Sequence, residues 1–301
     1  MKEVKIPKVN YIVAVSGGVD SVVLLDMLVN DIVPISNSSY GKPKPQFIVA
    51  HFDHGIREDS VNDAEFVKSL AKKYGLSFET KREELGANAS EDLARKRRYS
   101  FLRFLTKKYN AQIITAHHAD DVVETVLINL SRGTGWRGLA VMDSDIIRPL
   151  IKMTKLEVMN YAKKNKLTWH EDITNADEKY LRNRIRKKLA VIDDDVKRQF
   201  LGLWVYQKYL KKIIDDGILN LVNDIKASDD YMIYQRNKFD NLDESVALEL
   251  IRHITYGKLT RPQMKKLLDA VKNYRPSKIL QAGGGIEVSF TSRNFTVKLI
   301  K

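Results

Sequence analysis

The stretch Tyr11-Ile-Val-Ala-Val-Ser-Gly-Gly-Val-Asp-Ser21 decides the fold of this chain. The apolar and mostly β-branched run from Tyr11 to Val15 predicts a short buried strand. After the glycines, apolar residues recur at helical spacing and predict a helix: Val22, Leu24, Leu25 and Leu28. The backbone must therefore reverse at Gly17-Gly18, in a turn that joins a strand to a helix.

This turn has the composition of an anion-binding site. Gly17 and Gly18 let backbone N–H groups approach an anion, and the helix that follows directs its unpaired N–H groups toward the same place. Ser16 and Ser21 add hydroxyl donors. A carboxylate at Asp20 would repel a phosphate unless a divalent cation lay between them, so Asp20 is our candidate Mg²⁺ ligand. An ordinary glycine turn is the alternative interpretation.

The spacing of the turn residues excludes two common phosphate-binding motifs. No Gly-Lys-Ser or Gly-Lys-Thr follows the glycines, and the G-x-G-x-x-G spacing is absent. The turn instead resembles the pyrophosphate loop, Ser-Gly-Gly-x-Asp-Ser, of ATP-pyrophosphatase-type enzymes, which adenylate a carbonyl oxygen. The resemblance implies that ATP binds at Ser16, Gly17, Gly18, Val19, Asp20 and Ser21.

Composition restricts the class of protein. The chain has 301 residues, 44% of them hydrophobic, which makes two domains with a sizeable core the expectation. A formal net charge of +13 predicts a polyanionic partner, and nucleic acid is the first candidate. The absence of cysteine excludes disulfides, thiolate zinc sites, iron–sulfur clusters and a cysteine nucleophile. Neither a signal peptide nor a membrane span is recognisable, so we expect a cytoplasmic protein with no membrane partner.

Strands and helices alternate through the first half of the chain. Further strands are expected at 47–52, 77–80, 112–115 and 146–150, and further helices at 61–74, 90–109 and from residue 120. Pro149 makes the last of these an edge strand, because proline cannot donate to a ladder. This order predicts a parallel, doubly wound α/β sheet that is covered on both faces and binds ligands at the carboxyl ends of its strands.

Four of the six histidines follow two of these strands: His51, His54, His117 and His118. A metal site is one interpretation, but no cysteine assists and the spacing matches no zinc template. We assign His51 and His117 to the nucleotide pocket instead. Structural histidines at the entries of loops are the alternative.

Asp121 and Glu124 lie three residues apart on the expected helix, so both carboxylates project from one face and attract a cation. The alternative is that these acids only interact with the positive end of the helix dipole. This alternative explains Glu124 less well, because Glu124 lies farther from the start of the helix.

A dense basic cluster lies between Tyr180 and Lys188, in the sequence Tyr-Leu-Arg-Asn-Arg-Ile-Arg-Lys-Lys. It contains Arg182, Arg184, Arg186, Lys187 and Lys188. We interpret it as a surface for phosphates. The alternative is a solvated amphipathic helix, which is what basic runs usually form.

The alternation of strands and helices stops near residue 192. A long charged helix is expected from residue 193, connecting a catalytic domain at 1–192 to a second domain at 193–301. Two amphipathic helices are expected at 244–256 and 261–272, the second with a capping box formed by Thr260 and Gln263. Alternating apolar residues on both sides of 292–294 then predict a β-hairpin. The second domain is therefore expected to be mainly helical and to end in a β-hairpin.

Six motifs, taken in order from Tyr11 to about Leu189, resemble the tRNA(Ile)-lysidine synthetase family. They are SGGVDS at 16–21, HFDHGIR at 51–57, ARKRRY at 94–99, AHHADDVVET at 116–125, RPL at 148–150 and EDITNADEKYLRNRIR at 171–186. The last motif is the most specific, because many relatives share the pyrophosphate loop. The resemblance implies a five-stranded parallel sheet of order 3-2-1-4-5, and an ATP-dependent ligase that joins L-lysine to the wobble cytidine of tRNA(Ile) with a CAU anticodon.

The implied reaction assigns roles to the residues already singled out. Asp20 would hold Mg²⁺, and Arg182 or Arg186 would neutralise charge in the transition state. Asp121 and Glu124 would receive the lysine amine or a second metal, and their spacing does not choose between these. The oligomeric state stays open, with a homodimer as one option.

Two other classes of protein were weighed. Sulfur-transferring relatives generally use cysteines, which this chain lacks. A nucleic-acid-binding protein with a degenerate nucleotide site is the main alternative. The acids at Asp20, Asp121 and Glu124 argue against it, because they would repel phosphate for no purpose.

Overall fold

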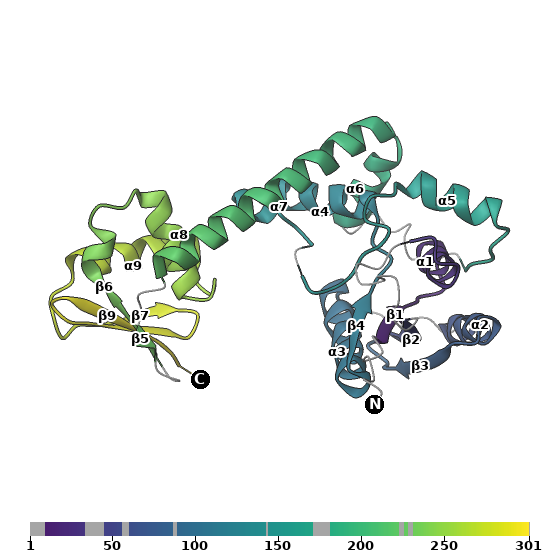
Figure 1. The fold of residues 1–301 in the computed structure, drawn as a ribbon, viewed down its shortest axis with the longest axis horizontal. Helices are drawn as coiled ribbons and strands as arrows, with labels where there is room; N and C mark the ends of the chain where they lie inside the picture. Colours follow the sequence, from purple (N-terminus) through teal and green to yellow (C-terminus); the bar gives the residue numbers. More distant parts are fainter. Residues whose placement is uncertain are drawn as a thin grey trace, which may run out of the picture. The chain divides into compact units, whose positions relative to one another are not determined.

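The computed structural model describes residues 10–33, 45–55, 60–86, 89–142, 144–170, 181–222, 226–227 and 231–300. The chain forms two compact units, Met1–Lys208 and Tyr209–Lys301, whose elements are labelled in Figure 1. Helix α7 (Asp194–Val222) contributes residues to both units. It is the long helix that we expected to begin the second domain.

A parallel sheet organises the first unit. Its strands are β1 (Asn10–Ala14), β2 (Gln46–Asp53), β3 (Ser77–Arg82) and β4 (Ala111–Ile114), in the order β3-β2-β1-β4. The helices between and after them are α1 (Val19–Val29), α2 (Ser60–Lys73), α3 (Glu91–Tyr109) and α4 (Ala119–Ser131). The predicted alternation of strands and helices is confirmed.

The alternating side chains of β1 pack against different helices. Tyr11 and Val13 contact the buried faces of α1 and α2, whereas Ile12 packs with Phe101 and Leu105 of α3. Figure 1 shows α3 on one side of the sheet and α1 and α2 on the other. Both faces are therefore covered, which explains why β1 is a continuous apolar run rather than an alternating one.

The expected fifth strand at 146–150 is not formed. Ile147 makes one isolated parallel bridge beside β4, in which its N–H donates to Ile113 O at 2.9 Å and its O accepts from Thr115 N at 3.0 Å. The chain then turns, with Ile151 N donating to Arg148 O at 3.2 Å. Because Pro149 has no N–H, the ladder cannot continue. The order 3-2-1-4 is observed among the described residues, and the five-stranded order is not confirmed.

The described part of the first unit contains four further elements: η1 (Trp136–Leu139), α5 (Lys155–Lys164), α6 (Leu181–Ala190) and the first half of α7. Helix α6 lies against α4. Trp204 of α7 packs with Val122 and Val126 of α4, and its indole N–H donates to Val141 O at 2.9 Å. These contacts fix α6 and α7 around the amino-terminal part of α4.

The second unit contains an antiparallel sheet of order β5-β6-β9-β8-β7. Its strands are β5 (Lys226–Ala227), β6 (Tyr231–Gln235), β7 (Ile279–Gly283), β8 (Ile286–Phe290) and β9 (Asn294–Leu299). Between them lie η3 (Arg236–Phe239), α8 (Glu244–Ile254) and α9 (Arg261–Asn273). The expected hairpin is confirmed as β8 and β9, and the capping box at Thr260 is present.

The second unit contains more β-structure than the expected hairpin. The hairpin is the centre of a sheet, because β6 pairs with β9 and β7 pairs with β8. The buried faces of α8 and α9 need an apolar partner, and Leu280, Val288 and Val297 of the sheet supply it. No helix among the described residues is long and apolar enough to cross a membrane.

Candidate active site

The loop between β1 and α1 is shaped by its own side chains. Gly17 has a φ of +97°, in the region that favours glycine. The buried Ser21 hydroxyl donates to Gly18 O at 2.8 Å and accepts from the N–H groups of Ser16 and Gly17 at 3.2 and 3.3 Å. The Ser21 hydroxyl proton is therefore engaged in a hydrogen bond within the loop. Ser16, in contrast, is exposed. In the first turn of α1, Ser21 N donates to Gly18 O at 3.1 Å, whereas helix geometry leaves the N–H groups of Val19 and Asp20 without an acceptor in the helix.

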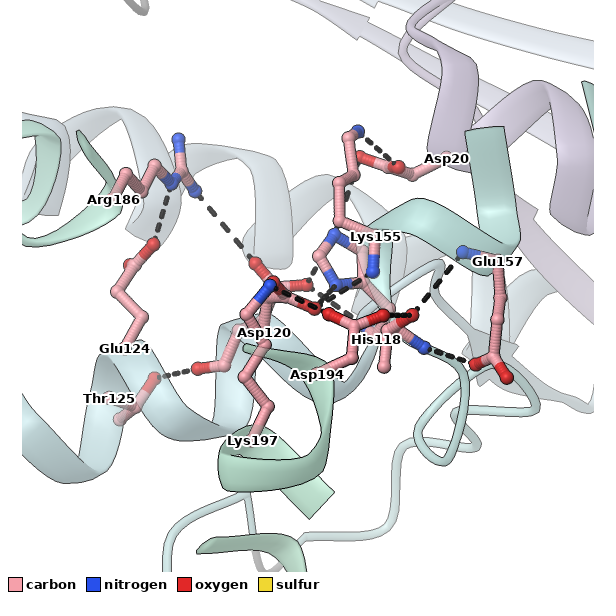
Figure 2. A network of polar contacts seen from close by, with 12 residues as sticks. Asp20, His118, Asp120, Glu124, Thr125, Lys155, Glu157, Arg186, Asp194 and Lys197 are labelled. Atoms are coloured by element: carbon pink, nitrogen blue, oxygen red, sulfur yellow. Dashed lines mark hydrogen bonds and ion pairs between the residues drawn. The ribbon is translucent and has the colours of Figure 1, made fainter. Parts of the chain in front are cut away.

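Asp20, in the first turn of α1, lies between two cationic groups. Lys155 Nζ, at the start of α5, lies 2.5 Å from Asp20 Oδ1, and His118 Nε2 lies 3.7 Å from Oδ2. Figure 2 shows the Lys155 and Asp20 side chains pointing toward each other. Burial alone would raise the pKa of Asp20, but the hydrogen bond and charge of His118 and the charge of Lys155 lower it to about 2. Asp20 is thus an anion at neutral pH.

His118 joins this group to the start of α4. Its backbone N–H donates to Asp121 Oδ2 at 2.9 Å, and its Nε2 lies 3.5 Å from the same oxygen. Burial lowers the pKa of His118, but Asp20 and Asp121 outweigh this effect and raise it. The structure therefore brings Asp20 and Asp121, which are 101 positions apart in the numbering, to the same ring nitrogen of His118.

Glu124 is held by two arginines of the basic cluster. Its side chain is only 4% exposed, with Arg182 Nε at one carboxylate oxygen and Arg186 Nε at the other, the latter at 2.6 Å. Arg182 also pairs with Glu91 of α3, and Arg186 Nη2 lies 3.8 Å from Asp121 Oδ1. Burial raises the pKa of Glu124 above its usual value, and the two guanidinium groups offset this only in part. The arginine at each oxygen favours the ionised form of the carboxyl.

The structure thus divides the basic cluster into two groups. Arg182 and the 44% exposed Arg186 donate to the buried Glu124, whereas the exposed side chains of Arg184, Lys187 and Lys188 supply the rest of the basic face of α6. The sequence interpretation treated all five as one surface for phosphates.

The histidines assigned to the nucleotide pocket lie at strand ends, as expected. His51 is buried and its Nδ1 donates to Val15 O at 2.9 Å, which ties β2 to the end of β1. His117 Nδ1 lies 2.7 Å from Thr115 Oγ1, and burial lowers the pKa of His117 to about 4. Both histidines therefore have protein partners, and His117 is neutral at pH 7.

Sequence reasoning missed Lys155, although it is the nearest cation to Asp20. A signal was present in the sequence Thr154-Lys-Leu-Glu157, which is a capping-box pattern. The structure confirms a helix start there, with Thr154 N donating to Glu157 Oε2 at 2.7 Å. A lysine in the first turn of a helix is disfavoured by the helix dipole, so its presence indicates a specific partner.

Asp20 has the properties of a Mg²⁺ ligand that works together with phosphate. No group of three or more His, Asp or Glu side chains in the described part of the chain could hold a metal by itself. Mg²⁺ usually takes one or two carboxylates and completes its shell with phosphate oxygens and water. Asp20 is ionised, one-third exposed and adjacent to the glycine loop. It fits the ion, provided that Lys155 leaves Oδ1.

Comparison with known proteins agrees with this geometry. The profile of the PP-loop domain family matches residues 2–192. A tRNA(Ile)-lysidine synthase of Thermotoga maritima is 31% identical over 302 residues, covering 93% of this chain and 68% of the relative. The chain belongs to the tRNA(Ile)-lysidine synthase family.

A second member of the tRNA(Ile)-lysidine synthase family, from Thermosipho africanus, is 32% identical over 304 residues, covering 93% of this chain and 66% of the relative. The chain thus spans about two thirds of the length of these relatives. The U34-tRNA thiolase NcsA of Methanococcus maripaludis, solved with its [4Fe-4S] cluster, has a TM-score of 0.54 at 18% identity and covers 70% of this chain and 74% of its own. This likeness shows the fold alone, and the present chain has no cysteine.

Proposed function

We propose that this chain ligates L-lysine to the wobble cytidine of tRNA(Ile) with a CAU anticodon, using ATP and forming lysidine. The observation that carries the proposal is the convergence of Asp20, His118 and Asp121 beside the glycine loop, in a member of the tRNA(Ile)-lysidine synthase family. An acid beside a phosphate-binding loop, with a second acid close by, suits a nucleotide and an amine in one site.

The first step is the adenylation of the tRNA. The cytosine 2-oxygen attacks the α-phosphorus of ATP, a new O–P bond forms, and the bond to pyrophosphate breaks. We assign the phosphates to the loop residues Ser16 to Ser21, which lie at the positive end of the α1 dipole. Mg²⁺ at Asp20 would supply positive charge to the leaving pyrophosphate. His51 and His117 remain our candidates for the rim of this pocket.

The second step is the attack of the lysine ε-amine on cytosine carbon 2. The ε-amine attacks in its deprotonated form, the C–N bond forms, the C–O bond breaks with its electron pair leaving on AMP, and the new nitrogen releases a proton to solvent. We assign the ammonium form, before it loses its first proton, to Asp121, whose Oδ1 lies 3.8 Å from Arg186 Nη2, because both oxygens of Glu124 accept closer hydrogen bonds from arginines. Glu124 then aligns Arg182 and Arg186, whose charges neutralise the departing AMP.

We assign tRNA binding to the exposed basic face of α6 and to the second unit. Arg184, Lys187 and Lys188 are exposed there, and the chain as a whole carries a net charge of +13. Because phosphate contacts release counterions, such a surface gives affinity that depends strongly on salt.

The test is the formation of AMP from ATP in the presence of Mg²⁺. We expect AMP to accumulate only when CAU-anticodon tRNA is present, and turnover to require lysine as well. A tRNA in which guanosine replaces the wobble cytidine is the matched control, and it should give no AMP. AMP formation that ignores the tRNA would contradict the proposal, and tRNA binding without AMP would support the alternative of a degenerate nucleotide site.

A further inference from the structure

Three helix starts meet at one buried lysine. Lys197, in the first turn of α7, is 5% exposed, and its Nζ lies 2.9 Å from Asp120 Oδ1 and 3.0 Å from Asp194 Oδ1. Asp120 is in the first turn of α4 and Asp194 begins α7. The second oxygen of Asp194 accepts from Thr154 Oγ1 at 2.9 Å, and Thr154 caps α5. Figure 2 shows the labelled side chains of Lys197, Asp194 and Asp120 gathered together.

This junction is two contacts away from Asp20. Asp120 Oδ2 accepts from the backbone N–H of Lys155 at 2.8 Å, and Lys155 Nζ reaches Asp20 Oδ1 at 2.5 Å. The Asp120 side chain that contacts Lys197 therefore also holds the backbone of Lys155, whose side chain contacts Asp20. Thr154, the neighbour of Lys155, donates to Asp194, which is the second acid that Lys197 contacts.

Lys197 keeps its charge in this buried position. Burial alone would lower the pKa of Lys197, but its hydrogen bonds and charge interactions with Asp120 and Asp194 raise it. A buried ion pair adds little stability compared with well-packed apolar residues of similar volume, because desolvation offsets the attraction. An ionic group at this junction is therefore better explained by the orientation that it imposes on its neighbours.

We propose that Lys197 is a positioning residue for the nucleotide site. It holds Asp120 and Asp194, these two acids fix the start of α5, and the start of α5 places Lys155 against Asp20. The inference rests on the proposed use of Asp20 in ATP binding.

The test compares Lys197→Met, which keeps the length and removes the charge, with Lys197→Arg, which keeps the charge. Lys164→Met is the matched control, because Lys164 is exposed in the last turn of α5, away from the start of this helix. AMP formation is measured while ATP, lysine and tRNA are varied in turn. Equilibrium titration of Mg²⁺·ATP without tRNA is measured beside it.

For Lys197→Met we expect the KM and the Kd for ATP to rise by about 10- to 100-fold, the range typical of residues that orient ligand-binding groups. The KM values for lysine and tRNA should stay within about threefold of the parent, in the same range as all three KM values of Lys164→Met. Lys197→Arg should retain most of the ATP affinity. A merely structural lysine would instead lower kcat through a smaller active fraction, with every KM unchanged.

A second variant separates positioning from stability. Lys197→Met leaves Asp120 and Asp194 uncompensated, so it should lower the melting temperature. Adding Asp194→Asn removes one of these charges and should recover much of that loss, while the ATP affinity stays weak. If the melting temperature and the ATP affinity both recover in the double variant, the inference is overturned. If the parent binds ATP but forms no AMP, the proposed function fails, and the ATP titrations still decide the role of Lys197.

Discussion

Replacing Glu124 with glutamine tests whether this residue aligns arginines or binds lysine. Glu124 is 4% exposed and meets Arg182 at one oxygen and Arg186 at the other. The substitution keeps the shape of the side chain, removes its charge, and replaces one acceptor oxygen with an NH₂ group that cannot accept. One arginine therefore loses its hydrogen bond to residue 124, and the other keeps a weaker, uncharged one.

The expected cost follows from the two contacts. A hydrogen bond to a charged group contributes about 1.5–3 kcal/mol. The arginine side chains are 28% and 44% exposed, so water partly replaces what is lost and the cost falls below the sum of two such bonds. We expect the free energy of unfolding to drop by about 2–3 kcal/mol. For a unit the size of Met1–Lys208, this lowers the melting temperature by about 4–12 °C.

The assay is thermal unfolding combined with lysine titration of AMP formation. Glu65→Gln is the matched control, because Glu65 is 69% exposed and its ion pair with Lys68 spans 3.6 Å at the surface. It should change stability by less than about 0.5 kcal/mol. Asp121→Asn is the functional comparison, and it should raise the KM for lysine by about 10- to 150-fold through the loss of one charged contact.

For Glu124→Gln we expect a lower kcat, with the KM for lysine within about threefold of the parent, because the arginines are misaligned and the amine site is intact. The reasoning is refuted if Glu124→Gln keeps its melting temperature and loses lysine affinity as strongly as Asp121→Asn. Glu124 would then bind the amine, as the sequence alone suggested.

Three further outcomes are expected. Asp20→Ala should lower the rate of AMP formation by about 100-fold or more, since it removes the metal-binding carboxylate. Its tRNA affinity, measured by filter binding, should stay within about twofold of the parent. AMP formation at the parental rate would show that Asp20 is not a metal ligand. Joint replacement of Lys187 and Lys188 by alanine should weaken tRNA binding and reduce its salt slope by about one unit per lost phosphate contact, whereas the same change at the exposed Lys163 and Lys164 should not. The pKa of His117 is lowered from 6.5 to about 4 in the folded protein, so protonation favours the unfolded state. The free energy of unfolding should therefore fall by up to about 3 kcal/mol as the pH falls from 6.5 to 4. Denaturant titrations should show a shallower pH dependence for His117→Gln than for the parent, and equal slopes would mean that the histidine is not buried as described.

The sequence predicted the parts of the fold that depend on local patterns. The run from Tyr11 to Val15, the glycine turn and the helix after it are present because apolar periodicity and turn chemistry are properties of short segments. Thr260 caps its helix as predicted for the same reason. Strand pairing is a property of distant segments, so the sheet around the terminal hairpin was missed and Ile147 was extended into a strand that Pro149 prevents.

The candidate site divides in the same way. Asp20 and the glycine loop were recognised from a contiguous motif, whereas Lys155 lies 135 positions from Asp20 and meets it only through the packing of α5 on α1. The inward turn of Arg182 and Arg186 likewise depends on how α6 lies against α4. A single sequence shows that these residues are charged, but it does not show which charge meets which.

The most direct test of the central claim is the mass of the tRNA product. CAU-anticodon tRNA is incubated with the protein, ATP, Mg²⁺ and isotopically labelled lysine, then digested to nucleosides and analysed by mass spectrometry. The account predicts that the wobble cytidine gains the mass of one labelled lysine less one water, and that omission of ATP abolishes the gain. An unchanged cytidine, recovered under conditions in which the protein binds both the tRNA and ATP, would contradict it.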